Sequence, residues 1–472
     1  MSIRTRFSPS PTGMIHLGNA RAALFSALFA KKNNGTFILR IEDTDAERSE
    51  VRYIEALQDD LHWLGVNWQE GPVVGGKFGP YLQSERQDIY AKYYDILMQQ
   101  QRIYPCFCSD QELMLARKIQ LSRGLPPRYM GTCKKLSSDE IAARIADGKK
   151  PAWRFTIPVD TKIEFVDTVK GQQSFNSDDI GDFIVRRADG TAPFLFCNAI
   201  DDALMEVSHV LRGEDHIANT PRQLLILQAL KLHTPLYGHL SLITGDDGSP
   251  LSKRHGSFSL DEMKAHGFLA IAIMNYLGRL GHATDVAELL DFDRFAEHFH
   301  LEKLSKSPAR FDRVQLMYWQ KLAVQALTTD ELWQWLGQGV AKLVPDNMKQ
   351  LFAETIKANI EFPQDAITYA NMFFTDSFEM DEEALAVIAN AENAYFTEAL
   401  NAIKQNGTDL KPTLDHLKKT LNINGKKLFM PLRVALTGNT HGPELALIAM
   451  ILGAEKMQQR LAKAESMYAK NI

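Results

Sequence analysis

The N-terminal residues best suited to chemistry are a histidine and a glycine at the start of an expected helix. A strand-like Ile3–Phe7 precedes a Pro/Gly loop at Ser8–Gly13, and His16-Leu17-Gly18 follows. Such a helix start binds anions, because its free backbone N–H groups and positive end face the ligand. His16 can donate to a phosphate oxygen, and Gly18 leaves room for an adenine ring. On these three residues alone, a histidine that merely completes the helix N-terminus is an equal alternative.

A second candidate is the polar loop Gly245–Gly256, which contains Ser252-Lys253-Arg254. When a carboxylate attacks an α-phosphate, negative charge builds up on phosphorus and on the leaving pyrophosphate. A cation carried by a flexible loop neutralises that charge. Taken alone, however, a Ser-Lys-Arg loop is most often ordinary surface.

A third candidate is a cluster of cysteines. Cys106, Cys108 and Cys133 lie close together in the chain, and Cys197 is the only other cysteine. So few cysteines argue against a disulfide scaffold, whereas their local grouping suggests zinc, which takes four ligands. No histidine stands nearby to be the fourth. Three reduced cysteines without a metal are the alternative.

The surrounding pattern predicts the elements that position these residues. A strand at 3–7, a helix at 16–32, a strand at 36–41 and a helix at 51–64 indicate a parallel sheet with crossovers. Short apolar pieces from about 103 to 189 indicate an inserted α+β region.

Strand signals resume at 194–200 and 207–211, and a helix is expected at 221–232. Beyond about Pro308 nearly everything has helical periodicity. The stretch 375–400 holds no Lys or Arg and seven Asp/Glu, and is interpreted as a hinge.

Composition is that of a soluble globular protein, and a cytoplasmic location is expected. Of the 472 residues, 45% are hydrophobic and 24% charged, and neither a signal peptide nor a membrane span is expected. The net charge is -5, yet residues 401–472 carry eleven Lys/Arg against five Asp/Glu. A basic end on an acidic body is compatible with RNA binding, and equally with a solvated helical surface.

Three longer strings resemble the class I glutamyl/glutaminyl-tRNA synthetases: Arg6–Gly13, His16–Arg21 and Ile41–Asp45. The loop at 245–256 resembles the mobile Lys-Met-Ser-Lys-Ser loop of this family, with Lys253 at its catalytic lysine and Pro250 in place of its first lysine. The resemblance implies catalytic roles for His16 and Lys253. The nucleotide-binding residues that it implies are Thr12, Gly13, His16, Gly18, Asn19, Ser252, Lys253 and Arg254.

The resemblance also implies a pocket for glutamate. Phe194 departs from the tyrosine that is usual in the family, so one hydroxyl donor is lost. A planar guanidinium at Arg212 favours a carboxylate over an amide, hence glutamate over glutamine. The glutamate-binding residues implied are Arg6, Ser8, Ser10, Glu42, Phe194, Asn198 and Arg212.

The family's architecture is a doubly wound, Rossmann-type α/β catalytic sheet with an α+β insertion, a connecting domain and an all-α anticodon-binding half. Here this implies a catalytic domain at 1–102 and 190–235, the acceptor-stem insertion at 103–189 and the connecting domain at 236–307. The helical anticodon-binding domains follow at 308–374 and 401–472, on either side of the hinge at 375–400.

The implied reaction uses ATP with Mg²⁺ to activate L-glutamate as an adenylate and then acylates tRNA(Glu), in a protein that works as a monomer. The resemblance further implies zinc bound by Cys106, Cys108, Tyr129 and Cys133.

Members that reject tRNA(Gln) carry an arginine where an ungapped count places Thr355, so we expect tRNA(Gln) to be charged as well. Two rivals remain: a tRNA-independent adenylate-forming ligase and a catalytically silent tRNA-binding relative.

Overall fold

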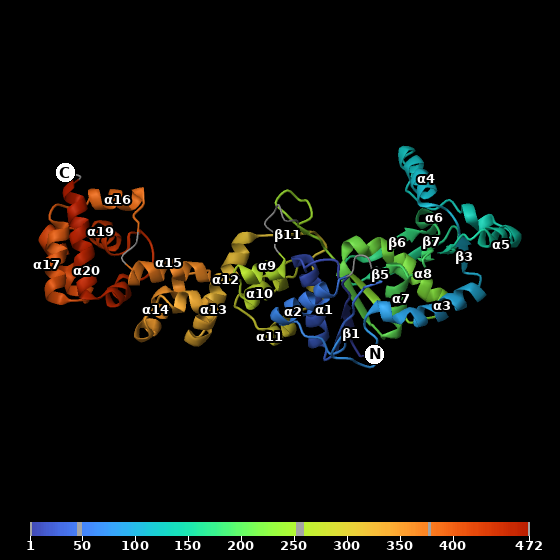
Figure 1. The fold of residues 1–472 in the computed structure, drawn as a ribbon, viewed down its shortest axis with the longest axis horizontal. Coiled ribbons are helices and arrows are strands. Elements are labelled where there is room, and N and C mark those ends of the chain that lie inside the picture. Colours follow the sequence, from blue (N-terminus) through green and yellow to red (C-terminus); the bar gives the residue numbers. More distant parts are fainter. Residues whose placement is uncertain (1, 45–49, 252–258, 376–378, 471–472) are drawn as a thin grey trace. The chain divides into compact units, whose positions relative to one another are not determined.

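The computed structural model describes residues 2–44, 50–251, 259–375 and 379–470 (Figure 1). The chain divides into two compact units. One unit comprises Met1–Ala265 and Ile273–Arg313, and the other comprises His266–Ala272 and Val314–Ile472.

A four-stranded parallel sheet forms the centre of the first unit. Its order is β2-β1-β8-β9, and every neighbouring pair is parallel. The strands are β1 (Arg4–Phe7), β2 (Thr36–Leu39), β8 (His209–Gly213) and β9 (Leu236–Leu240). All four residues of β1 are buried, as expected for a strand whose two faces are covered by crossover helices. The predicted doubly wound sheet is therefore confirmed.

The helices around this sheet are α1 (Leu17–Lys32), α2 (Val51–Trp63), α3 (Gln87–Gln99), α7 (Phe194–Leu204) and α8 (Thr220–Leu230). Three of them, α1, α2 and α8, match predicted ones, whereas α3 was not predicted and α7 replaces a predicted strand. The strand predicted at 194–200 is wrong, because this segment is the first part of α7. A short, continuously apolar run does not distinguish a buried strand from a buried helix, and α7 is apolar because it is buried nearly all round.

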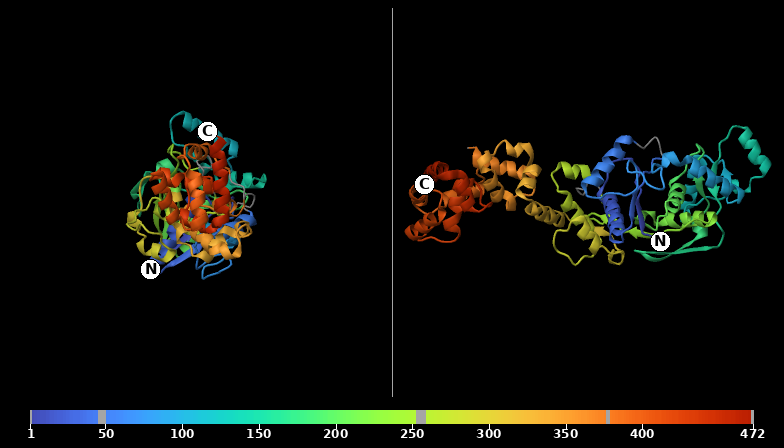
Figure 2. Two further views of the ribbon diagram at one scale, coloured as in Figure 1. Left: turned by 90° about the vertical axis from the view of Figure 1, so that its left-hand side faces the viewer. Right: turned by 90° about the horizontal axis from the view of Figure 1, so that it is seen from below.

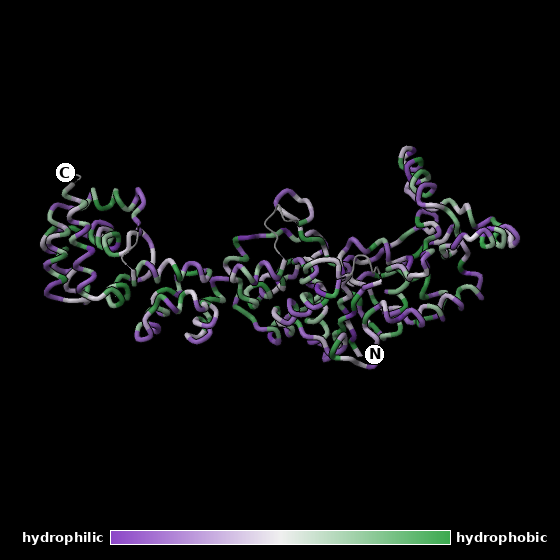
Figure 3. Tube along the Cα trace, viewed as in Figure 1, coloured by the Kyte–Doolittle hydropathy of each residue, from purple (hydrophilic) through white to green (hydrophobic). Residues whose placement is uncertain are grey.

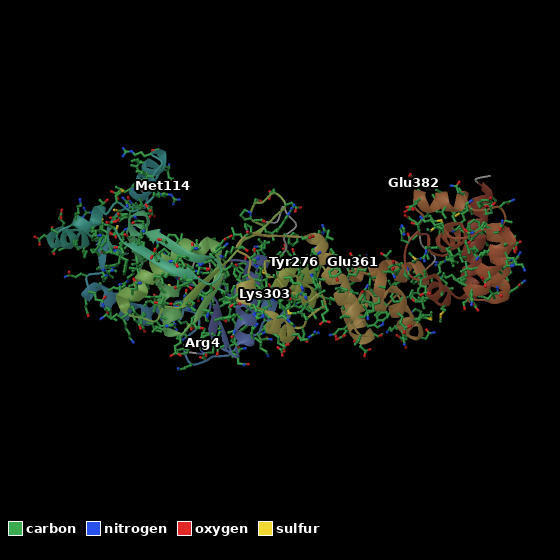
Figure 4. All side chains as sticks on the ribbon, turned by 180° about the vertical axis from the view of Figure 1, so that it is seen from behind. Arg4, Met114, Tyr276, Lys303, Glu361 and Glu382 are labelled. Carbon is green, nitrogen blue, oxygen red and sulfur yellow. The ribbon has the colours of Figure 1, made fainter. Side chains whose placement is uncertain are left out.

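The insertion has an α+β structure, as predicted. Its three-stranded sheet, order β3-β4-β7, is antiparallel, and a separate hairpin pairs β5 with β6. Helix α4 stands away from this sheet (Figure 1) and exposes Met114, which Figure 4 labels. The elements are β3 (Ile103–Cys106), α4 (Asp110–Ser122), α5 (Ser138–Ala146), β4 (Ala152–Phe155), β5 (Lys162–Asp167), β6 (Gly171–Asn176), α6 (Ser177–Ile180) and β7 (Phe183–Arg186).

After β9 the chain forms a short two-stranded parallel sheet and three helices. Strand β10 (Ile243–Thr244) pairs with β11 (Ala309–Arg310). The helices are α9 (Leu260–Ala265), α10 (Ala270–Arg279) and α11 (Phe292–His298). Tyr276 of α10 accepts a hydrogen bond from the backbone N–H of Asp312 at 2.8 Å, so the segment after β11 is held against this helix.

All the described elements of the chain beyond β11 are helical, as predicted. Hydrophilic and hydrophobic positions alternate along them (Figure 3), and the apolar ones form one core cluster from Val324 to Ala464. Ala384 and Ile388, inside the acidic stretch 375–400, belong to this core. The helices are α12 (Arg313–Ala326), α13 (Thr329–Ala341), α14 (Lys349–Ile356), α15 (Pro363–Phe374), α16 (Glu382–Ala389), α17 (Tyr395–Asn406), α18 (Leu410–Leu421), α19 (Lys426–Thr437) and α20 (Leu445–Lys470).

Among the described residues, no helix combines the length and the apolar character needed to cross a bilayer.

Candidate active site and metal centre

A cavity of about 640 Å³ opens in the first unit where the strands of the central sheet end. Phe7, Gly213 and Leu240, the last residues of β1, β8 and β9, line it. In open parallel sheets this edge is where ligands bind. The sequence-predicted residues that line the cavity are Arg6, Ser8, Ser10, Thr12, Gly18, Asn19, Glu42, Phe194, Asn198 and Arg212.

Arg212 is a buried cation of the cavity wall. It is 6% exposed, and among the described residues it forms no ion pair. Its Nε donates to His239 at 3.2 Å and its Nη2 to Thr220 at 2.9 Å, whereas its Nη1 is buried without a partner. Burial lowers the pKa of Arg212 to about 10, which still leaves it charged at pH 7. An unpaired buried guanidinium is a natural partner for a ligand carboxylate.

Arg6 is already partly neutralised. Its Nε donates to Asp202 at 3.2 Å, and Asp202 also pairs with Nη2 of Arg40 at 2.8 Å. Asp202 is fully buried, and its pKa lies below the ordinary value because the two guanidiniums outweigh its burial. Of the two arginines predicted to bind glutamate, Arg212 is therefore the one without a carboxylate partner.

Glu42, Ser8 and Asn198 meet at the buried guanidinium of Arg40. Its Nε donates to Ser8 at 3.0 Å and its Nη2 to Asn198 at 2.7 Å. Burial raises the pKa of Glu42, and Arg40 and hydrogen bonds from Ser8 and Asn198 oppose that rise. The Asn198 amide also donates to the carbonyl of Phe194 at 3.2 Å. Asn198 thus has both ends of its amide engaged and supports the wall of the cavity.

The same cavity is lined by Gly18 and Asn19 at the start of α1 and by Pro250 of the polar loop. His16 is the exposed N-cap residue of α1 and forms a β-bridge with Ser259; it does not line the cavity, and nor does Gly13. A Cβ added to Gly18 would meet nothing within 4 Å, so the helix backbone there faces open space. Ser252, Lys253 and Arg254 lie outside the described residues. The chain before them runs past the cavity at Pro250, which bridges to Thr244.

Phe194 begins α7 and lies on the cavity wall against His216, with ring centroids 5.1 Å apart. His216 also lines the cavity, and burial lowers its pKa to about 4, so the ring is neutral at pH 7. Two aromatic rings therefore form one side of the cavity, at the position where the sequence lacks a tyrosine hydroxyl.

The four predicted metal ligands converge at one end of β3. The sulfur atoms of Cys106, Cys108 and Cys133 all lie within 4.8 Å of one another. The Tyr129 hydroxyl is 3.5 Å from the sulfurs of Cys106 and Cys108, and the backbone N–H of Cys133 donates to it at 2.8 Å.

This donor set fits zinc. A tetrahedral ion with Zn–S of about 2.3 Å and Zn–O of about 2.0 Å requires S···O edges of about 3.5 Å. Nε of Arg154 donates to the Cys106 sulfur at 3.1 Å, so a cation partly offsets the negative charge of the ligands. Although burial opposes it, hydrogen bonds from Tyr129 and Arg154 hold the pKa of Cys106 below its ordinary value. Burial raises the pKa of Cys108 to about 11 in the absence of a metal.

Thr355 does not present its side chain to RNA. It is 2% exposed, in α14, and its hydroxyl donates to the carbonyl of Leu351 at 2.7 Å. Thr355 stands where the ungapped count places the arginine of discriminating members, and its buried side chain is not available for a contact with tRNA. Nearby Lys357 directs its ammonium to the carbonyl of Leu327.

Sequence reasoning missed the buried groups beneath the cavity, among them Arg40, Asp201 and Asp202. Asp201 accepts from Arg86 at 2.7 Å and from Tyr90 at 2.7 Å. The signal was available, because two adjacent aspartates in the apolar run 194–204 must be paired if the run is buried. As a helix, this run stacks Phe194, Asn198 and Asp202 about one turn apart on one face, with Asp201 beside them, whereas a strand would space the first three about 13 Å apart.

Two family profiles match the chain. The profile described as "tRNA synthetases class I (E and Q), catalytic domain" matches residues 2–318. The profile described as "Anticodon binding domain" matches residues 315–465.

Curated relatives match over nearly their full length. Glutamate--tRNA ligase 1 of Coxiella burnetii (strain CbuG_Q212) is 52% identical over 462 residues, which cover 98% of this chain and 99% of the relative. Glutamate--tRNA ligase 2 of Nitrosococcus oceani is 48% identical over 460 residues, 98% of each chain.

Solved structures also match. The glutamate-tRNA synthetase of Elizabethkingia anophelis superposes with a TM-score of 0.89 at 28% identity, covering 99% of this chain and 100% of that one. A glutamate tRNA ligase from Elizabethkingia meningosepticum, solved in complex with its amino acid, gives a TM-score of 0.88 at 28% identity, with 99% of each chain covered.

Proposed function

Because the chain belongs to the class I tRNA synthetases for glutamate and glutamine, we propose that it is a glutamate–tRNA ligase. In the first step a glutamate carboxylate attacks the α-phosphate of ATP, giving glutamyl-adenylate and pyrophosphate. In the second step the terminal ribose of tRNA(Glu) accepts the glutamyl group and AMP leaves. Mg²⁺ accompanies ATP and neutralises phosphate charge.

The observation that carries this proposal is the unpaired guanidinium of Arg212 in the cavity wall. It selects glutamate within a family that also includes glutamine enzymes. A carboxylate accepts from a guanidinium, whereas the NH₂ end of a glutamine amide would place donor against donor. Arg6 and Glu42, buried at the same cavity, provide further charges for the substrate's α-carboxylate and ammonium.

The start of α1 is the place we assign to ATP. Thr12, Gly18 and Asn19 line the cavity there, and the backbone N–H groups of the first turn are free for phosphate oxygens. Pro250, just before residues 252–258, lines the cavity, and Ser259, just after them, pairs with His16 at the start of α1. We propose that His16 and Lys253 both act on the phosphates of ATP.

ATP–pyrophosphate exchange separates this function from its rivals. Exchange that depends on glutamate, not glutamine, together with esterification of tRNA(Glu), is expected. A catalytically silent relative would give neither reaction. An adenylate-forming ligase that does not use tRNA would give exchange without any acylated tRNA.

We propose that the insertion binds one Zn²⁺ through Cys106, Cys108, Tyr129 and Cys133. Elemental analysis of protein purified without chelators is expected to find about one equivalent of zinc. Cys108→Ser should lose most of it, because a hydroxyl is a poor zinc ligand beside thiolates. Cys197→Ser is the matched control, since Cys197 is buried in α7 and donates to the carbonyl of Ala192. Less than about a tenth of an equivalent in the unaltered protein would contradict the proposal.

We also propose that the enzyme charges tRNA(Gln) in addition to tRNA(Glu). The two anticodons differ only in their third base, C or G, and an arginine in the first helical anticodon-binding domain rejects G in discriminating relatives. Residues 314–432 of this chain contain no arginine. The nearest cation to Thr355, Lys357, is engaged by the carbonyl of Leu327. The part of the helical half between Arg313 and Arg433 therefore supplies no guanidinium to read the third base.

Transcripts of tRNA(Glu), tRNA(Gln) and a tRNA(Glu) whose third anticodon base is changed from C to G test this specificity. A bidentate contact to a base contributes about 1–3 kcal/mol of discrimination between bases. Without such a contact, the acylation efficiencies of the three transcripts should lie within about 100-fold of one another. The altered tRNA(Glu) isolates the base itself from the rest of the tRNA. If its efficiency fell more than about 100-fold, other contacts would read the base.

We place this activity in the cytoplasm, in a monomeric protein. All four cysteines are free, as expected in a reducing compartment. The mass in solution should be that of one 53.2 kDa chain.

A further inference from the structure

The turn of the β5–β6 hairpin packs directly against β9, although the hairpin belongs to the insertion. The backbone N–H of Thr168 donates to the carbonyl of Tyr237 at 2.8 Å. A Cβ at Gly238 would lie 2.4 Å from the hydroxyl of Thr168, so only glycine allows this approach. The hairpin and the central sheet can be followed together in Figure 2. The insertion therefore has a fixed contact with the strand that ends at the cavity.

Asp167, the last residue of β5, begins a chain of buried hydrogen bonds that ends at Arg212. One Asp167 oxygen, Oδ2, accepts from Nδ1 of His239, and the opposite ring nitrogen, Nε2, accepts from Nε of Arg212 at 3.2 Å. Thr220 contacts both Arg212 and His239. Its hydroxyl accepts from Nη2 of Arg212 at 2.9 Å and lies 3.1 Å from Nε2 of His239. His239 and Asp167 are 0% and 2% exposed, so water does not compete for these bonds.

The hydrogen-bond geometry favours a His239 ring with its proton on Nδ1, because Nδ1 faces Asp167 whereas Nε2 faces the N–H of Arg212. Burial lowers the pKa of His239 below its ordinary value despite the adjacent Asp167. A protonated ring would also present an N–H to the N–H of Arg212, which is unfavourable. Asp167 therefore selects the tautomer in which Nε2 is an acceptor.

We propose that Asp167 and His239 are positioning residues for Arg212: by fixing the histidine tautomer, the insertion orients the guanidinium that binds the substrate carboxylate. This rests on the proposed role of Arg212. Neither residue lines the cavity, so neither touches glutamate. With Nε and Nη2 held by His239 and Thr220, the guanidinium keeps its plane and Nη1 remains for the ligand.

A purely structural role for Asp167 can be distinguished from a positioning role, because its two carboxylate oxygens bind different groups. Oδ1 accepts three backbone N–H groups, those of Val169, Lys170 and His239, at 2.9, 2.7 and 3.1 Å. Among the described residues, the hydrogen-bond partner of Oδ2 is the His239 ring. Asp167→Asn can keep every backbone bond through its amide oxygen while its NH₂ donates to Nδ1. The proton of His239 then moves to Nε2, against the N–H of Arg212.

We expect Asp167→Asn to raise the KM for glutamate about 10- to 100-fold in tRNA(Glu) acylation, the cost of one lost charged hydrogen bond. The kcat at saturating glutamate and the KM for ATP should change by less than about threefold, because Arg212 acts on glutamate alone. Asp182→Asn is the matched control: Asp182 also lies in the insertion and accepts from Tyr104 and Ile157, without a link to Arg212. A glutamate KM in Asp167→Asn within about twofold of the unaltered enzyme would overturn the proposal.

A double-mutant cycle tests the route through the tautomer. In His239→Gln the amide oxygen can turn toward Arg212 whichever residue stands at position 167. Adding Asp167→Asn to His239→Gln should therefore raise the glutamate KM by less than about twofold. A further tenfold rise in the double variant would show that Asp167 acts by another route. If Arg212→Gln impairs glutamate use while Asp167→Asn leaves the glutamate KM unchanged, this inference alone is overturned. If Arg212→Gln uses glutamate normally, the proposed function of the pocket is overturned.

Discussion

Replacing Arg212 with glutamine is expected to reduce kcat/KM for glutamate about 30- to 5000-fold. This range corresponds to the roughly 2–5 kcal/mol of binding free energy that is lost when one partner of a buried charge pair is removed. The substrate carboxylate would enter a buried wall from which the cation that we assign to it had been taken away. Initial rates of tRNA(Glu) acylation over a range of glutamate concentrations measure the effect.

The thermal stability of the Arg212→Gln variant should not fall together with its activity. Arg212 is buried without a carboxylate partner, so its charge is a cost to the folded protein until glutamate binds. We expect the unfolding midpoint of ligand-free Arg212→Gln to equal or exceed that of the unaltered enzyme. Added glutamate should raise the midpoint of the unaltered enzyme only. Arg222→Gln is a suitable control, because Arg222 binds the carbonyl of Ala218 and does not line the cavity. Unchanged glutamate use in Arg212→Gln would place the pocket elsewhere.

Replacing Lys253 with alanine is expected to slow glutamyl-adenylate formation about 100- to 1000-fold, the usual cost of one transition-state contact. Glutamate binding should be nearly unchanged, because the lysine acts on charge that appears only during phosphoryl transfer. The loss should approach the upper end of the range, since Pro250 occupies the place of the other usual cation. ATP–pyrophosphate exchange in the presence of tRNA measures the rate.

Lys264→Ala provides the comparison for this substitution. Lys264 is an exposed lysine of α9, in the same stretch of chain, and it does not line the cavity. Its removal should leave the exchange rate within about twofold. An exchange rate in Lys253→Ala equal to that of the unaltered enzyme would remove Lys253 from the mechanism.

The sequence was informative where chemistry fixes residue types at short spacing. The Ser8–Gly13 loop, the start of α1 and the segment after β2 follow one another closely in the chain, and all contribute to the cavity. The Cys-x-Cys pair and Cys133 likewise form a local cluster. Such groups were predictable because loop and element order alone bring them together.

Longer-range features could not be read from the sequence. The periodicity of 194–200 was ambiguous, and the predicted strand ended before Asp202, so the one-turn spacing of Asn198 and Asp202 on a helix was not predicted. The link from Asp167 to His239 depends on a hairpin that packs against a distant strand, which no local pattern records. Thr355 was chosen by counting residues, and burial of its side chain is a property of the tertiary packing of α14.

The order of the central sheet has a consequence for synthesis of the chain. Strand β1 lies between β2 and β8, and β8 is separated from β2 by the whole insertion. At about 5–20 residues per second, a ribosome needs roughly 10 s or more to translate the intervening segment. During that interval the edge of β1 that later pairs with β8 has no partner strand. Chaperone contact with the nascent chain is therefore expected to be greatest before β8 emerges, because an open apolar strand edge is a site for aggregation.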